Sequence, residues 1–153
     1  EVFIFTDVDL QFLGPVRAIV EEAARGLDLV LQREFEDIGV NIGFIAVRNS
    51  PASRAFWTHV RAEIERTQAL DQRVVNNALY SGLAQRDFGV EWGRFPVKVW
   101  CSSMAYSGDP PLDVVLHHAN FTCVRAISRD PSVKLGQLKE IADAVRSGDG
   151  EVL

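Results

Sequence analysis

An uninterrupted apolar run, Val2 to Phe5, opens the sequence and is followed by Thr6 and by Asp7-Val8-Asp9. A short apolar run of β-branched and aromatic residues predicts a strand, and the lack of polar alternation predicts that both of its faces are buried. We therefore expect a central strand of a partly parallel sheet, with a neighbouring strand on each side. Open α/β sheets bind ligands just beyond the carboxyl ends of such strands, which is where Asp7 and Asp9 lie.

The remainder of the chain mixes strand and helix patterns, which predicts an α/β fold. Ser50-Pro51 and Asp130-Pro131 are the clearest helix starts, because Ser and Asp cap helices and Pro fits the first helical position. No repeat or linker interrupts residues 1–153, so we expect a single domain. The predicted strands are Leu27–Leu31, Ile42–Val47 and Val97–Trp100, and the predicted helices are Val16–Arg25, a helix from Pro51, Leu70–Leu83 and Pro131–Ser147.

Charge and composition exclude several classes of partner. The chain has 153 residues and a formal net charge of -5, with 16 basic residues spread among 21 acidic ones. Without a basic stripe, we expect no nucleic-acid partner and no binding to anionic membranes. No apolar run approaches the ~20 residues of a bilayer span. The chain is therefore expected to be soluble, in the cytoplasm of a bacterium or in the Golgi lumen of a eukaryote.

The two cysteines, Cys101 and Cys123, do not form a metal-binding motif. They lie too far from each other and from the 3 histidines for a zinc site of the CxxC type. We expect two buried thiols, with a disulfide as the less favoured alternative.

Asp7 and Asp9 form the sharpest chemical motif in the sequence. Residues two apart in an extended segment point to the same side, so the two carboxylates are expected to reach one cation. Two carboxylates suit a hard divalent ion such as Mg²⁺ or Mn²⁺, which often also binds substrate phosphates. Taken by itself, the pattern also fits a solvated acidic turn.

Three further polar segments lie close to predicted strand or helix ends. Gly43, within Asn41-Ile42-Gly43-Phe44, indicates close backbone approach, although a plain turn before a strand has the same pattern. Asp71-Gln72 with Asn76 lies at a predicted helix start, where ordinary capping is the alternative. His117-His118-Ala119-Asn120 follows an apolar run, where a partly buried histidine without a ligand role is also common.

Taken in order, these motifs resemble those of the nucleotide-diphospho-sugar transferase family. These are glycosyltransferases of the GT-A fold and include plant cell-wall xylosyl- and arabinosyltransferase relatives. The resemblance implies a Rossmann-related, mixed and partly parallel sheet flanked by helices. The matching residues are Phe5-Thr6-Asp7-Val8-Asp9, Leu13-Gly14-Pro15, Asn41 with Gly43, Phe44 and Arg48, Trp57, Asp71-Gln72 with Asn76, and His118-Ala119-Asn120.

The resemblance also implies an activity and a set of site residues. The expected reaction moves a sugar, with retention at the anomeric carbon, from a nucleotide-diphosphate sugar, most favourably a UDP-sugar. The acceptor is a glycan, a protein or a small molecule, and a divalent metal, Mn²⁺ rather than Mg²⁺, binds the diphosphate. The implied metal ligands are Asp7, Asp9 and His118, the implied catalytic residues are Asp71 and Gln72, and the implied substrate-binding residues are Asn41, Gly43 and Asn76.

Among the histidines, His118 rather than His117 or His59 should face the acidic pair, because only His118 has the family's His-Ala-Asn setting. His59 falls in the middle of a predicted helix among polar neighbours. We expect it to be solvated.

The sequence departs from the family pattern in two ways. Ile42 stands where the family has a small hydroxyl residue. In GT-A domains, the βαβ units that form the nucleotide-base pocket precede the DxD strand, whereas in this chain the DxD strand comes first. We therefore expect the C-terminal portion of a GT-A-type domain, with weak or no sugar transfer by these residues alone. In that case the strand Val2–Phe5 should lack a neighbour on one side or be covered by another chain.

Two other functions fit parts of the same pattern. A phosphatase of the haloacid-dehalogenase type also has a strand followed by DxD, with the first Asp as nucleophile and the second as general acid. Asp109 and Asp113 would supply its later acidic pair, although Pro110-Pro111 favours an exposed turn there instead. The third function is a non-catalytic glycosyltransferase remnant that binds a metal or a glycan.

Overall fold

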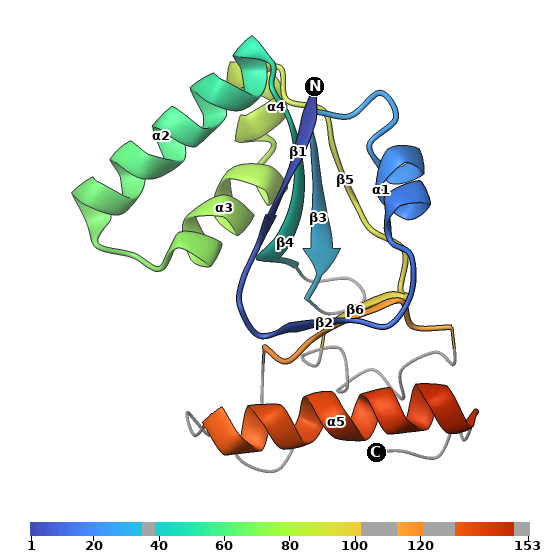
Figure 1. Cartoon of the computed structure of the whole chain (residues 1–153). Coiled ribbons are helices and arrows are strands. Elements are labelled where there is room, and N and C mark those ends of the chain that lie inside the picture. Colours follow the sequence, from blue (N-terminus) through green and yellow to red (C-terminus); the bar gives the residue numbers. More distant parts are fainter. Residues whose placement is uncertain (35–38, 102–112, 121–130, 149–153) are drawn as a thin grey trace.

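The fold contains two sheets that meet at the end of the first strand (Figure 1). A computed structural model describes residues 1–34, 39–101, 113–120 and 131–148. The larger sheet has the order β1 (Val2–Thr6), β4 (Val40–Arg48), β3 (Leu29–Arg33) and β5 (Trp92–Arg94). The smaller sheet has the order β2 (Leu10–Phe12), β7 (Leu116–His118) and β6 (Val99–Cys101).

The strand directions confirm a mixed, partly parallel α/β fold. β3 pairs with β5 in parallel, and so does β6 with β7. The pairs β1–β4, β3–β4 and β2–β7 are antiparallel. These features are consistent with a GT-A-like domain.

Helices cover both faces of the larger sheet and one side of the smaller sheet. In Figure 1, α1 lies on the opposite side of the larger sheet from α2, α3 and α4, and α5 runs beneath the smaller sheet. None of the helices among the described residues has the length and apolar character needed to cross a bilayer. The bounds are α1 Arg17–Ala23, α2 Pro51–Thr67, α3 Asp71–Tyr80, α4 Leu83–Phe88 and α5 Pro131–Ser147.

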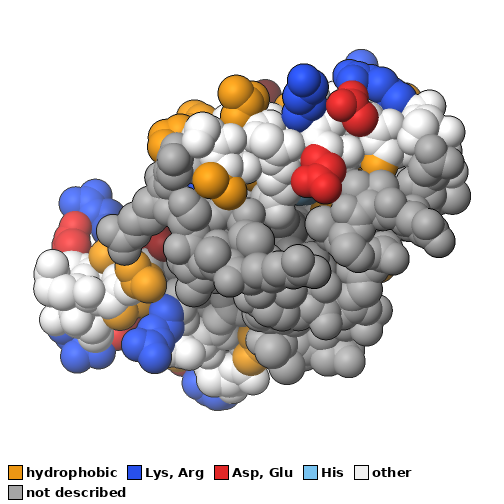
Figure 2. Space-filling view, turned by 90° about the horizontal axis from the view of Figure 1, so that it is seen from below, with side chains coloured by type: hydrophobic (Ala, Val, Ile, Leu, Met, Phe, Trp, Pro, Cys, Tyr) orange, Lys and Arg blue, Asp and Glu red, His pale blue; other side chains and the backbone are white. Residues whose placement is uncertain are grey.

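Charged side chains of both signs are interspersed on the surface. On the face seen from below in Figure 2, Lys and Arg side chains stand next to Asp and Glu side chains. Several of the charged neighbours on helix surfaces are ion pairs, such as Arg61 with Glu65 and Arg146 with Asp143. This pattern agrees with the mixed charge distribution of the sequence.

Alternation along β3 separates two apolar cores. Leu29 and Leu31 are fully buried against α2, α3 and α4, whereas Val30 packs on the opposite face with residues of α1 and the smaller sheet. Gln32 is two residues beyond Val30 and is also fully buried. A polar side chain therefore enters the space between the two sheets.

The predicted helix start at Ser50-Pro51 is confirmed. The Ser50 hydroxyl accepts a hydrogen bond from the Ser53 backbone N–H at 3.1 Å, and the Ser53 hydroxyl accepts one from the Ser50 N–H at 3.1 Å. This reciprocal capping box satisfies two backbone donors at the start of α2. It fixes the direction of α2 as the chain leaves β4.

Most predicted elements exist with small shifts in their bounds. The helix predicted over Leu70–Leu83 is α3, which ends at Tyr80 just before Gly82 adopts a left-handed conformation. The short helix α4 that follows was not predicted. The three-residue strands β2, β5 and β7 were not predicted either, because three residues carry too little periodicity to identify a strand. Asp130, the predicted cap of α5, lies outside the described residues.

The prediction that Val2–Phe5 is a central strand with two neighbours is wrong for this chain. Among the described residues β1 pairs only with β4, so it is an edge strand of the larger sheet, and the pairing is antiparallel. Phe3, Ile4 and Phe5 are 52%, 41% and 51% exposed. An apolar run indicates that both faces of a strand are apolar, but it does not indicate how many strands pair with its edges.

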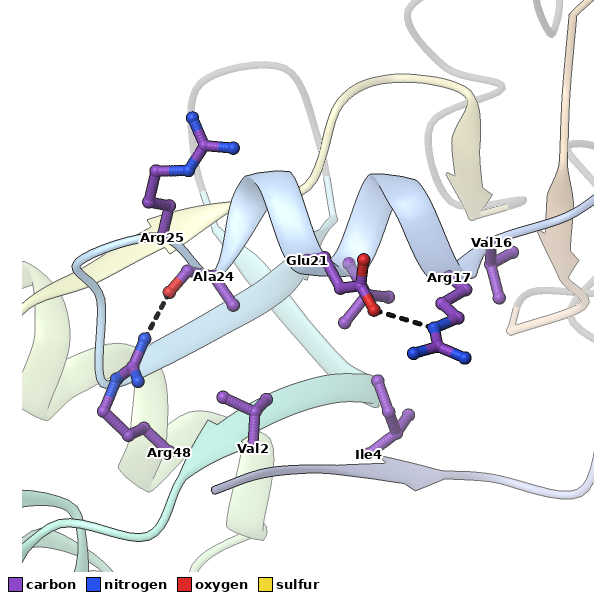
Figure 3. Close-up of a pocket in the computed structure, with 9 residues that line it drawn as sticks. Val2, Ile4, Val16, Arg17, Glu21, Ala24, Arg25 and Arg48 are labelled. Carbon is purple, nitrogen blue, oxygen red and sulfur yellow. Dashed lines mark hydrogen bonds and ion pairs between the residues drawn. The ribbon is translucent and has the colours of Figure 1, made fainter.

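A groove lies along each face of β1. Val2 and Ile4 point toward α1 and line a groove of about 460 Å³ (Figure 3). Phe3 and Phe5 line a second groove, of about 860 Å³, on the side of α2. β1 therefore combines a backbone edge with which no described strand pairs and apolar side chains on both faces, and this combination favours pairing with another strand.

We predict that this 153-residue chain self-associates through β1 as its concentration rises, and that Phe3→Lys shifts it toward the monomer. A charge on an exposed edge strand opposes edge-to-edge pairing. Sedimentation velocity over a concentration series measures the effect. Leu135→Lys is the control, because Leu135 is 67% exposed on helix α5, whose backbone is not an open strand edge. An equal shift with the control variant would contradict the role of β1.

Candidate functional site

Asp7, Asp9 and His118 converge where the two sheets meet. One ligand atom of each residue lies within 4.8 Å of the ligand atoms of the other two. Among the described residues, these three form a cluster of acidic and histidine side chains that could hold a metal ion. His118 Nε2 lies 3.3 Å from Asp9 Oδ1 and 3.7 Å from Asp7 Oδ2. The structure thus brings together the three residues predicted as metal ligands.

The chain path explains why the two carboxylates face the same side. Asp7 follows β1, and its backbone N–H donates to the Gly43 carbonyl at 2.8 Å. Asp9 precedes β2, and its carbonyl accepts from the Ala119 N–H at 3.0 Å. Val8, between them, is fully exposed. The crossover from the larger to the smaller sheet is therefore held at both ends, with alternate side chains turned to the site.

The side chains of Asp7 and His118 pack against the backbone at Gly43. A Cβ atom at this position would lie 2.7 Å from Asp7 Oδ2 and 2.8 Å from His118 Nδ1, closer than real Cβ contacts. The predicted close approach at Gly43 is therefore confirmed. Glycine is required here by space, since Gly43 does not have a positive φ.

Gln32 contacts His118 from the side opposite the carboxylates, and no sequence motif pointed to it. His118 Nδ1 lies 2.9 Å from Gln32 Oε1. The Gln32 amide nitrogen donates to the Trp100 carbonyl at 2.8 Å and to the Val99 carbonyl at 3.4 Å. The one available signal was a polar residue directly after the apolar run Leu29–Leu31.

The electrostatics of the cluster favour a neutral imidazole between carboxylates. His118 is 1% exposed, and burial lowers its pKa below the usual value, although Asp9 and Asp7 oppose this shift. For Asp9, burial raises the pKa, but the hydrogen bond from Lys134 and the charge of Lys134 outweigh it. The pKa of Asp9 is therefore lowered overall. At neutral pH the site offers two anionic groups and one neutral nitrogen.

Lys134 on α5 brings a positive charge to this cluster. Its ammonium group donates to Asp9 Oδ2, and both side chains are largely shielded from solvent. The contact joins residues 125 positions apart in the chain. Periodicity could not reveal it, because only tertiary packing brings α5 to the crossover.

The other two histidines lie away from the acidic pair. His117 belongs to the opposite face of β7, where it is in register with Gln11 and Trp100. Burial lowers the pKa of His117 to about 4. His59 is partly exposed, with its ring centroid 5.2 Å from that of Phe88, so it is less solvated than predicted. Its helix neighbours are polar, but α4 covers it.

The groove of about 860 Å³ leads from Asp7 to the start of α3. Asp71 is exposed there, and its Oδ1 accepts from the Gln72 N–H at 2.7 Å, in keeping with a role at the helix start. Gln72 Oε1 accepts from the Ile42 N–H at 3.4 Å. The residues that line this groove include Phe3, Phe5, Asp7, Ile42, Asp71, Gln72 and Asn120.

Asn41 and Asn76 lie beside the site but use their amides inside the protein. Asn41 is 1% exposed, donates to Glu34 Oε2 at 2.7 Å and accepts from the Gly43 N–H at 2.7 Å. Asn76 donates to the Val40 and Gln72 carbonyls at 2.8 Å and accepts from the Val40 N–H at 2.8 Å. Both amides therefore fix β4 relative to its surroundings.

Among the described residues that were expected to serve other chemistry, Asp113 lies outside the cluster. Asp113 is exposed and lies 4.0 Å from Lys98, while Asp109 and Cys123 lie outside the described residues. Cys101 is a buried thiol. Its Sγ lies 4.0 Å from His118 Nδ1, on the side of the ring away from the carboxylates.

A comparison with protein families gives one match. The family model for nucleotide-diphospho-sugar transferases matches residues 2–125. This span contains the acidic pair, the groove residues and His118. Searches of curated proteins and of solved structures found no match.

We predict that Gly43→Ala displaces His118 or Asp7 and lowers the affinity for Mn²⁺ by roughly tenfold or more, the usual range for disturbing the support of a ligand. Electron paramagnetic resonance of free Mn²⁺ measures the affinity. Gly136→Ala is the matched control, because a Cβ at Gly136 meets nothing within 4 Å. Unchanged Mn²⁺ affinity in folded Gly43→Ala would show that the cluster does not bind the ion.

Proposed function

Because the chain belongs to the nucleotide-diphospho-sugar transferase family, we propose that Asp7, Asp9 and His118 hold the divalent cation of a sugar-transfer reaction whose donor is a UDP-sugar. The observation that carries this proposal is the convergence of two carboxylates and one neutral imidazole at the crossover between the sheets. Three ligands on one side leave coordination positions for phosphate oxygens.

The chemistry of the three ligands favours Mn²⁺ over Mg²⁺. Mg²⁺ prefers oxygen ligands only, whereas Mn²⁺ accepts carboxylates and binds imidazole more readily. When bound, the cation would neutralise negative charge on the departing diphosphate. The residues of the chain hold and orient the reacting groups. Gly43 gives the cluster space, and Asn41 holds the Gly43 backbone in place.

The groove beyond Asp7 is the proposed place of the sugar. Asp71 presents an exposed carboxylate to it, and Gln72 presents an amide. A carboxylate accepts hydrogen bonds from sugar hydroxyls, and an amide can both accept and donate them. We therefore assign the catalytic and orienting contacts with the sugar to Asp71 and Gln72. Asn76 supports this end of the groove from behind by joining Gln72 to β4. Asn41 and Gly43 act in the same supporting way rather than through direct sugar contacts.

We predict that UDP binds this chain in the presence of Mn²⁺ and at least about tenfold more weakly in its absence, because the cation bridges the carboxylates to the diphosphate. Asp9→Asn should remove the Mn²⁺-dependent part, since it replaces a charged ligand with a neutral one of the same shape. Isothermal titration calorimetry with UDP, with and without Mn²⁺, measures both effects.

Asp113→Asn is the matched control for this experiment, because Asp113 is an exposed carboxylate outside the cluster. It should bind UDP as the unmodified chain does. UDP binding that is equal with and without Mn²⁺ would refute the metal role. Hydrolysis of a simple phosphomonoester that depends on Asp7 would instead favour the phosphatase, and neither binding nor turnover would favour the non-catalytic remnant.

We further predict that Lys134→Met tightens Mn²⁺ binding by about two- to fivefold. Lys134 and the ion compete for Asp9, and a partly exposed ion pair contributes up to about 1 kcal/mol. The variant lacks the competing ammonium group, so isothermal titration calorimetry with Mn²⁺ should give a lower dissociation constant for the ion.

Lys139→Met is the control, because Lys139 is an exposed lysine of the same helix. It removes the same charge without removing a contact to Asp9. Weaker Mn²⁺ binding in Lys134→Met would mean that Lys134 orders the site instead of competing for it.

A further inference from the structure

We infer that Gln32 is a positioning residue that fixes the tautomer of His118, so that Nε2 carries the lone pair facing Asp7 and Asp9. The inference concerns the protein without any bound ion. Only the purpose of this tautomer, which is to present a ligand nitrogen to the cation, rests on the proposed function. The two claims can therefore fail separately.

The orientation of the Gln32 amide is set by its own partners. Its nitrogen donates to the Trp100 carbonyl at 2.8 Å and lies 3.4 Å from the Val99 carbonyl. Carbonyl oxygens only accept hydrogen bonds, so the amide nitrogen must face β6 and the amide oxygen must face His118. A flipped amide would place oxygen against oxygen in a fully buried site.

The amide oxygen in turn decides which ring nitrogen carries the hydrogen. Gln32 Oε1 lies 2.9 Å from His118 Nδ1 and can only accept, so Nδ1 is the donor. A neutral imidazole has a single N–H, and its other nitrogen has a lone pair. Nε2 is therefore the lone-pair nitrogen, and it lies 3.3 Å from Asp9 Oδ1 and 3.7 Å from Asp7 Oδ2.

The residues around His118 restrict rotation of its ring. Gln32 is 0% exposed and His118 is 1% exposed, and Gln32 links β3 of the larger sheet to β6 of the smaller sheet. Gly43 closes another side of the ring, where even a Cβ atom would approach Nδ1 to 2.8 Å. Two rigid sheets thus hold the ring, and the lone pair faces the space that the carboxylates share.

Nuclear magnetic resonance of ¹⁵N-labelled histidine tests the tautomer directly, in metal-free protein at about pH 8, well above the ordinary histidine pKa. We expect His118 Nδ1 to show the signature of a protonated nitrogen and Nε2 that of an unprotonated one. Gln32→Met removes the acceptor while keeping the length of the side chain. It should convert His118 to the Nε2–H form and lower Mn²⁺ affinity by about 10- to 100-fold.

Gln32→Glu tests whether the acceptor is the cause, because one oxygen of its carboxyl group can still accept from Nδ1–H while the other must carry a proton to replace the donor to the Trp100 carbonyl. It should keep the Nδ1–H form of His118. Gln11→Met is the matched control, since Gln11 lies beside His117 on the other face of the smaller sheet. It should leave the His118 signals unchanged.

An Nε2–H tautomer in the unmodified protein would overturn the inference, and so would an Nδ1–H tautomer that persists in Gln32→Met. The first measurement needs no variant, so a misfolded Gln32→Met protein cannot leave the question open. An Nδ1–H tautomer in a protein that binds no Mn²⁺ would support the role of Gln32 and refute the proposed metal function.

Discussion

The close approach of Asp7, Asp9 and His118 is the constraint around which the rest of the site is arranged, because the two carboxylates repel each other and, in the tautomer inferred above, also repel the lone pair of His118 Nε2. This nitrogen lies 3.3 and 3.7 Å from the two carboxylates, and water screens the buried His118 and the largely buried Asp9 poorly, whereas the Asp7 side chain is about half exposed. The fold therefore has to hold the groups together against this repulsion or supply positive charge. It does both, because two sheets fix the backbone and Lys134 compensates part of the charge at Asp9. A divalent cation would compensate all of it.

The junction of two sheets explains why these groups can be held so closely. One sheet alone provides rigid neighbours in a single plane, whereas here β1 delivers Asp7, β2 follows Asp9, and β7 carries His118 from another direction. Gln32 reaches from β3 to both β6 and His118, so the hydrogen bonds that order the imidazole also tie the two sheets together. A buried amide with its polar atoms satisfied strengthens such a junction, whereas an apolar side chain would leave the His118 N–H without an acceptor.

The sequence predicted those parts of the site that depend on local pattern. Asp7 and Asp9 stand two apart after an apolar run, and the glycine at position 43 interrupts a strand, so both features could be recognised from the chain alone. Gln32 and Lys134 could not be found in this way, because they lie 86 and 125 residues from their partners and no periodicity connects them. The apolar pattern of Val2–Phe5 alone predicted a central strand, and only the departure from the family pattern predicted a missing neighbour, since the number of strands beside β1 is a tertiary property.

The internal use of Asn41 and Gly43 also explains how the chain accommodates Ile42, where the resemblance implies a small hydroxyl residue. Asn41 holds Glu34 and the Gly43 backbone, and Gly43 gives space to Asp7 and His118, so neither role depends on the side chain between them. Ile42 lines the groove instead, while its backbone N–H donates to Gln72. An isoleucine there changes the polarity of the groove wall and leaves the frame of the cluster intact. The frame of the cluster and the polarity of the groove wall are thus set by neighbouring residues of one strand, and they can vary independently.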